Sequence, residues 1–126
     1  MKELTKEQLD RPRRRLHQRV QPLRQRHLDQ LTKKENNQVI FIYTPFCATC
    51  QLAEKMLRYV SEMKDELLLY KMNASFFPDF MHEHQIESVP ALIQLNKDVV
   101  KHKLYAFESV TNIFEKLNVW QNESIR

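Results

Sequence analysis

The sequence predicts an α/β fold in which helices lie on both faces of a mixed central sheet. Three observations carry this prediction. An apolar run at 39–43 is followed by apolar residues at helical spacing, a second strand-then-helix pattern comes next, and two short strands joined by a three-residue loop lie near the end. The order βαβα followed by ββα indicates parallel strands first and an antiparallel hairpin at one edge of the sheet.

The first half of this pattern has clear local signals. Residues 38–43 are expected to form a buried strand, because 39–43 are a continuous apolar run. Residues 47–63 carry an apolar stripe at helical spacing. A second strand is expected over 66–72. Pro78 then begins a short helix over about 78–84, because proline suits the first helical turn.

The second half predicts a hairpin and a closing helix. Strands are expected at 91–95 and 99–104, and the loop 96–98 between them suits an antiparallel pair. Ser109 is expected to cap the last helix. The apolar stripe of that helix consists of Val110, Ile113, Phe114 and Leu117.

Charge is distributed unevenly along the 126 residues. Residues 1–36 carry 11 Lys and Arg against 5 Asp and Glu, a net of +6, whereas 37–126 carry 9 against 11, a net of −2. The main domain therefore lacks the excess of positive charge that is typical of nucleic-acid binding. No apolar run reaches the roughly 18–20 residues of a membrane span, so no membrane partner is expected. The start of the chain has no apolar secretory signal, and a cytoplasmic, reducing location is expected.

The chain contains no glycine. Turns must therefore be made by Asn, Asp, Ser or Pro, and we expect Asn or Asp wherever the backbone needs a positive φ. The absence of glycine also excludes a glycine-rich phosphate loop and with it a nucleotide-binding site of that kind.

The basic segment 1–36 fits the pattern less well than the domain expected at 37–126. Pro12 and Pro22 would each end or kink a helix, and Leu9-Asp10 recurs as Leu28-Asp29. One interpretation is that 11–29 is an insertion into a single helix. The other is an ordinary kinked basic helix. A nucleic-acid arm is disfavoured because interleaved aromatic residues are missing.

Both cysteines lie in the segment Phe46-Cys47-Ala48-Thr49-Cys50, between a strand and a helix. Two thiols at i and i+3 in a first helical turn can close into a disulfide and reopen, and the first lies where the helix N-terminus favours a thiolate. A structural zinc site needs four ligands. His82 and His84 could supply two of them, but residues at i and i+2 do not share a helix face. Two unrelated buried thiols are the third interpretation.

Val89-Pro90 lies directly before the strand expected at 91–95. Proline cannot donate to a sheet ladder, so by itself this pair indicates a strand start or a special turn. It follows the C-x-x-C pair by about 40 residues. A C-x-x-C pair and a proline at this spacing together form a motif set that is more specific than either one alone.

The chain resembles the thioredoxin family over about residues 37–119, with Met1–Asp10 and Gln30–Asn36 corresponding to the usual opening strand and helix. The resemblance implies a thioredoxin fold, a cis peptide at Val89-Pro90 facing the dithiol, and dithiol–disulfide exchange. The matching segments are Ile40–Tyr43, Phe46–Cys50, Tyr70–Asn73, Ile86–Ala91 and the closing hairpin and helix.

Residue roles follow from this resemblance. Cys47 would be the exposed nucleophile and Cys50 the resolving thiol, while the backbone of Val89 beside Pro90 would pair with a bound substrate chain. Phe46 would be an apolar wall. No cofactor or metal is implied beyond the redox-active Cys47–Cys50 pair, and the implied partners are protein disulfides and a reductase or thiol reductant.

Tyr43 would also form part of the apolar wall of the site. For both Tyr43 and Phe46, the alternative is that the ring only packs in the hydrophobic core. The sequence also departs from the family pattern. Ala48-Thr49 replaces the common Gly-Pro, which bears on the redox potential, and Phe41 stands where many members carry a buried Asp. No carboxylate is expected nearby, and Lys71, the usual partner of that Asp, is expected to be solvated or to snorkel to the surface.

Two functions therefore remain open. One is a thiol–disulfide oxidoreductase. The other is a thioredoxin-fold binding or adaptor module with weak or regulatory redox activity.

Overall fold

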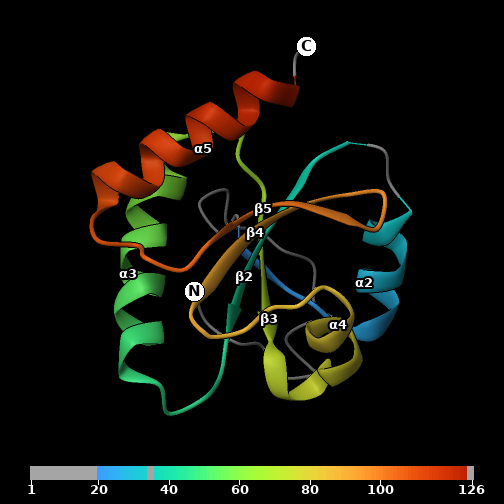
Figure 1. Ribbon diagram of the computed structural model, residues 1–126. Coiled ribbons are helices and arrows are strands. Elements are labelled where there is room, and N and C mark those ends of the chain that lie inside the picture. Colours follow the sequence, from blue (N-terminus) through green and yellow to red (C-terminus); the bar gives the residue numbers. More distant parts are fainter. Residues whose placement is uncertain (1–19, 34–35, 125–126) are drawn as a thin grey trace, which may run out of the picture.

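The computed structural model describes residues 20–33 and 36–124. Strands and helices alternate through the first three quarters, and a hairpin and a long helix follow (Figure 1). The elements are β1 (Val20–Pro22), α2 (Gln25–Thr32), β2 (Gln38–Tyr43), α3 (Ala48–Met63), β3 (Leu69–Asn73), the 3₁₀ turn η1 (Ala74–Phe76), α4 (Pro78–Glu83), β4 (Ala91–Asn96), β5 (Val99–Leu104) and α5 (Val110–Ser124). Most bounds agree with the sequence pattern, although β3 begins three residues later than expected.

The sheet is mixed, as predicted. Its five strands lie in the order β1-β3-β2-β4-β5. β1 and β2 both pair in parallel with β3, whereas β4 pairs antiparallel with β2 and with β5. The crossovers between the parallel strands contain helices, and the antiparallel hairpin closes one edge. This element order and mixed sheet are those of the α/β fold that the family resemblance implies.

Helices cover both faces of the sheet, so the molecule has three layers. α3 and α5 lie on one face, and α2 and α4 lie on the other (Figure 1). The central strand β2 is buried along its whole length and supplies both cores, because alternate side chains point to opposite faces. Val39 and Phe41 pack with α3 and α5, while Ile40 and Ile42 pack with α2 and α4. Among the described residues, no helix is long and apolar enough to cross a membrane.

The domain includes residues that the sequence pattern placed outside it. Residues 20–22 form the edge strand β1, where Pro22 at the strand end is compatible with the sheet. Leu28 and Leu31 of α2 are 2% and 3% exposed and belong to the core under α4. The first described strand and helix are therefore β1 and α2, and α2 overlaps the segment Gln30–Asn36 at its first three residues. Met1–Asp10, expected to be part of the opening elements, lies outside the described residues. Residues 20–29 are part of the fold, whereas 1–19 lie outside the described residues, and the insertion expected at 11–29 stays a prediction.

The turns do not follow the expectation that Asn or Asp would occupy every positive φ. Asp98 does so with φ 63°, next to Lys97 with φ 46°, and the two form the β4–β5 turn. Positive φ at both central residues matches the twist of a hairpin. The remaining described cases are Phe46, Gln85 and Glu108, with φ of 62°, 53° and 63°. Without glycine, the tertiary structure holds bulky residues in a conformation that local sequence disfavours.

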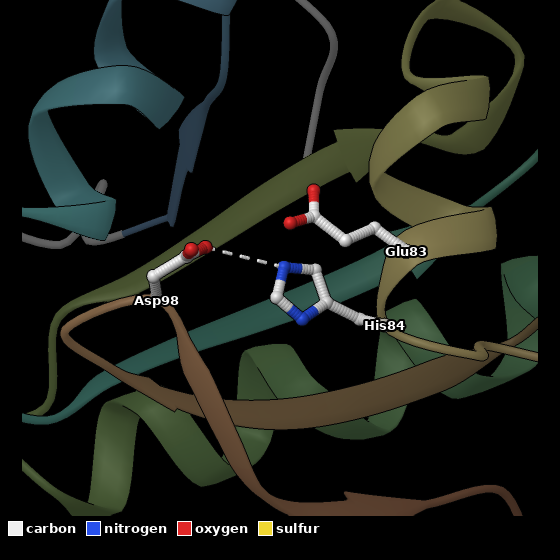
Figure 2. Close-up of side chains that lie close together, drawn as sticks. All are labelled: Glu83, His84 and Asp98. Atoms are coloured by element: carbon white, nitrogen blue, oxygen red, sulfur yellow. Dashed lines mark ion pairs between the residues drawn. The ribbon is translucent and has the colours of Figure 1, made fainter.

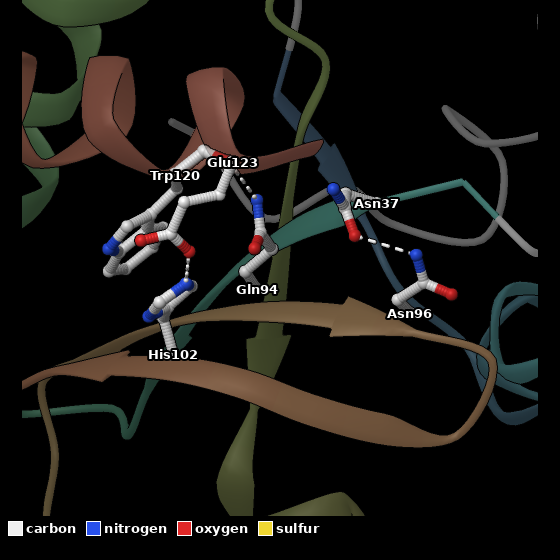
Figure 3. A network of polar contacts seen from close by, with 6 residues as sticks. All are labelled: Asn37, Gln94, Asn96, His102, Trp120 and Glu123. Carbon is white, nitrogen blue, oxygen red and sulfur yellow. Dashed lines mark hydrogen bonds and ion pairs between the residues drawn. The ribbon is translucent and has the colours of Figure 1, made fainter. Parts of the chain in front are cut away.

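Polar contacts attach α5 to the sheet (Figure 3). The His102 ring stacks on Trp120 with centroids 5.2 Å apart, and His102 also contacts the Glu123 carboxylate. Gln94, only 2% exposed, donates from Nε2 to the Trp120 carbonyl oxygen at 3.4 Å. At the start of the helix, the Ser109 Oγ accepts from the Asn112 N–H at 3.0 Å, which confirms the predicted cap.

Candidate active site

Cys47 is the N-cap residue of α3. Its backbone is extended, with φ −104° and ψ 109°, and its Sγ accepts a hydrogen bond from the Cys50 N–H at 3.2 Å. The first N–H groups of a helix have no partner within the helix, and an oxygen side chain usually satisfies one of them. Here a sulfur does so, and the helix N-terminus therefore stabilises negative charge on that sulfur.

Hydrogen bonds lower the pKa of Cys47 below its ordinary value. The Cys50 side chain contributes most, and the Thr49 hydroxyl follows, with Oγ1 lying 3.3 Å from Sγ. The Cys50 and Thr49 N–H groups act in the same direction. Cys47 is partly exposed. A thiol with a lowered pKa and access to solvent is the kind that reacts as a thiolate.

Cys50 has the opposite character. It is 3% exposed in the core between the sheet and α3, and burial raises its pKa to about 11. Its hydrogen bond to Cys47 and the charges of Cys47 and Glu54 raise the pKa further. Both cysteines are free thiols in the structure. The pair thus combines an accessible, more acidic thiol with a buried, protonated one.

Lys71 corrects the expectation of a solvated lysine without a carboxylate partner. Its side chain is 4% exposed, and its Nζ lies 3.4 Å from Glu54 Oε1 and 5.0 Å from the centre of the Tyr43 ring. Glu54 comes from α3, one turn after Cys50, so a helix supplies the carboxylate that Phe41 on the strand cannot. The i, i+4 spacing of Cys50 and Glu54 is visible in the sequence and could have shown that this carboxylate lies on the Cys50 side of the helix, although not that it meets Lys71.

Tyr43 and Phe46, the two aromatic residues expected to form apolar walls of the dithiol site, have different environments. Tyr43 is 8% exposed and stacks on Phe41 with ring centroids 6.0 Å apart, so it belongs to the core. Phe46 is 101% exposed and has a positive φ, directly before Cys47. A large apolar ring beside the accessible thiol is available to another molecule.

Val89-Pro90 lies at the same end of the sheet as the dithiol. Ile42 pairs with Ala91 in the antiparallel register, so Pro90 comes at the sheet end where β2 leads towards Cys47. The Val89-Pro90 peptide is cis, as the resemblance implied. Val89 packs against the same core cluster as Cys47, the cluster that contains Cys50.

The histidines considered as partners for a zinc site do not join the cysteines. His84 lies at the end of α4 with its ring 4.4 Å from Phe80, and Phe80 belongs to the core on the opposite face of the sheet. His82 is exposed on α4. A Cys₂His₂ site is therefore not assembled from these four residues.

Comparisons with known proteins agree with this geometry. The family model Thioredoxin matches residues 19–118. Thioredoxin-like protein YusE of Bacillus subtilis (strain 168) is 36% identical over 96 residues, which cover 76% of this chain and 89% of that relative. The chain belongs to the thioredoxin family, and the match includes β1 and α2.

Solved structures show the same fold at low sequence identity. Thioredoxin from Trypanosoma brucei brucei superposes with a TM-score of 0.71 at 12% identity, covering 89% of this chain and 98% of that chain. The oxidized form of mitochondrial thioredoxin 3 from Saccharomyces cerevisiae gives a TM-score of 0.67 at 15% identity, covering 83% and 99%. Family membership supports a redox-type function in general terms.

Proposed function

We propose that this protein is a thiol–disulfide oxidoreductase that exchanges protein disulfides through Cys47 and Cys50. The observation that carries the proposal is the asymmetry of the pair. Cys47 is accessible, caps a helix and has a lowered pKa, whereas Cys50 is buried and has a pKa of about 11. The Cys47 thiol is suited to attack a substrate disulfide, whereas the Cys50 thiol stays protonated until the second step.

The proposed reaction has two exchange steps. The Cys47 thiolate attacks one sulfur of a substrate disulfide, forming a mixed disulfide and releasing the other substrate sulfur as a thiolate that takes a proton. Cys50 then loses its proton and attacks Cys47 Sγ, releasing the second substrate sulfur as a thiolate. Two electrons pass from the dithiol to the substrate, and the protein is left with a Cys47–Cys50 disulfide. The pair itself carries the electrons, so the cycle needs no bound cofactor.

The second step needs a proton acceptor for Cys50. The Glu54 carboxylate is close enough for its charge to raise the pKa of Cys50. A carboxylate this close to Cys50 is also a suitable acceptor for the thiol proton, directly or through water. Lys71, 3.4 Å from Glu54 Oε1, holds the carboxylate in place.

Substrate contact is assigned to the surface around Cys47. The fully exposed Phe46 ring would pack against apolar groups beside the substrate disulfide. The backbone of Val89, beside Pro90, would pair with an extended substrate chain. A reductase or thiol reductant of a reducing compartment such as the cytoplasm would return the pair to the dithiol form.

Reduction of insulin disulfides tests the proposal. The wild-type protein should accelerate the reduction with a chemical or an enzymatic reductant, and Cys47→Ser should abolish the acceleration. Cys50→Ser should accumulate a mixed disulfide with the substrate, because attack proceeds and resolution does not. A wild-type rate no higher than that of Cys47→Ser with either reductant would favour the adaptor function instead.

The redox potential would define the direction of the reaction. A value near about −270 mV indicates a reductant and one near about −120 mV an oxidant. Ala48-Thr49 between the cysteines is the segment expected to set this value, and Ala48→Gly with Thr49→Pro is the matched variant that tests its contribution.

A further inference from the structure

Three potential metal ligands meet on the face of the sheet opposite the dithiol (Figure 2). Glu83 is the last residue of α4, His84 follows it as the C-cap, and Asp98 lies in the β4–β5 turn. One ligand atom from each residue lies within 4.8 Å of the others. The carboxylates of Glu83 and Asp98 face the Nε2 side of the imidazole (Figure 2).

The His84 Nε2 atom is the most informative part of this cluster. The side chain is 9% exposed, and Nε2 is buried without a hydrogen-bond partner among the described residues. Its distance to Asp98 Oδ1 is 3.4 Å, which is longer than a good hydrogen bond. Two ligands of a tetrahedral Zn²⁺ at 2.0–2.2 Å lie about 3.3–3.6 Å from each other, so the separation fits a shared metal ion.

The protein holds the imidazole in this orientation. The His84 ring contacts Phe80 with centroids 4.4 Å apart. Lys103 of β5 donates from Nζ to the carbonyl oxygens of His84 and Gln85, at 2.7 and 2.9 Å. These bonds attach the end of α4 to the strand that follows Asp98, and they fix His84 and Asp98 relative to each other. A side chain that is already held in place, as the His84 imidazole is, loses little conformational entropy when a metal ion binds.

The surroundings favour a cation. Glu83 and Asp98 line a pocket of about 300 Å³ between α2, α4 and the β4–β5 turn. Asp29 and Asp79 line the same pocket, so four acidic residues surround it. A concave surface with charge of one sign raises the local concentration of the opposite ion. The exposed Glu83 side chain can rotate to complete the coordination.

We propose that Glu83, His84 and Asp98 form a binding site for a divalent transition-metal ion such as Zn²⁺. The three side chains supply one nitrogen and two carboxylate oxygens, and water completes the tetrahedron. The imidazole favours Zn²⁺ over Ca²⁺ and Mg²⁺, which prefer oxygen ligands alone. The site is separate from the dithiol, because α4 and α3 lie on opposite faces of the sheet (Figure 1).

Calorimetric titration of the full chain tests the proposal. The background variant is Cys47→Ser with Cys50→Ser, since thiolates also bind Zn²⁺. Zn²⁺ should bind at one site more tightly than Ca²⁺ or Mg²⁺, and His84→Ala should weaken Zn²⁺ binding at least tenfold. His82→Ala, an exposed histidine on the same helix, is the matched control and should leave the affinity unchanged.

Two further measurements separate a metal site from a purely structural role of His84. The His84 ring nitrogens should shift in NMR spectra of the background variant when Zn²⁺ is added. Asp98→Asn, with its fold verified by circular dichroism, should also weaken binding. Equal affinity of the two histidine variants, no Zn²⁺ binding, or tighter binding of Ca²⁺ or Mg²⁺ would overturn the proposal.

Discussion

The reactivity of the two thiols can be predicted from their environments. Reduced wild-type protein exposed to a thiol-alkylating reagent should be modified first at Cys47. Hydrogen bonds lower the pKa of this residue below the ordinary value of 9.0, whereas burial raises the pKa of Cys50 to about 11. Because the thiolate is the reactive form, the two residues should differ in rate at every pH below about 9.

The size of the difference follows from these values. A gap of at least two pH units gives Cys47 at least about a hundredfold larger thiolate fraction near pH 7. The more basic Cys50 thiolate is the better nucleophile by about six- to tenfold, which offsets part of that gap. Ionisation alone therefore leaves Cys47 about tenfold faster or more. The burial of Cys50, which is 3% exposed, should increase the ratio further.

Peptide mapping after short labelling times measures both rates in one sample. The Cys47 rate should rise with pH and pass its midpoint below pH 9, whereas the Cys50 rate should still be rising above pH 10. Unfolded protein in denaturant is the control, and there the two residues should react at similar rates. Faster labelling of Cys50 than of Cys47 near pH 7 in the folded protein would refute the assigned roles.

Three further substitutions have defined outcomes. Thr49→Val removes the hydroxyl 3.3 Å from the Cys47 sulfur and should raise the pKa of Cys47, measured by thiolate absorbance, because that hydroxyl is one of the groups that lower it. Glu54→Gln takes the charged partner from the buried Lys71 and should cost about 2 kcal/mol in urea unfolding, less than a fully buried pair because Glu54 is partly exposed. The same change should lower the pKa of Cys50. Ser109→Ala removes the cap of α5 and should cost about 1 kcal/mol.

Matched controls come from exposed positions of the same residue types. Thr111→Val, Glu62→Gln and Ser88→Ala should each leave stability and thiol acidity nearly unchanged. An unchanged pKa of Cys47 in Thr49→Val would contradict the role of the hydroxyl. A stable Glu54→Gln variant with an unaltered pKa of Cys50 would contradict the role of the Glu54–Lys71 pair.

Sequence patterns predicted the elements that depend on local signals. The strands predicted at 38–43 and 99–104 have the bounds that the structure shows. Ser109 was identifiable as a cap because a cap acts within one helical turn. β1 was missed because three residues containing a proline have no recognisable period, and only pairing with β3 makes them a strand.

The chain by itself determined that a dithiol stands between a central strand and a helix, since the C-x-x-C spacing and the flanking apolar patterns are local. It also determined that turns are made without glycine. Only the tertiary structure decided which residues take positive φ, because packing and hairpin twist select Phe46 or Lys97 against their local preference. It also decided which polar side chains meet. Glu54 reaches the buried Lys71 across the helix–sheet interface, and Asp98 reaches His84 across a hairpin turn. These contacts join residues far apart in sequence, and no local pattern specifies them.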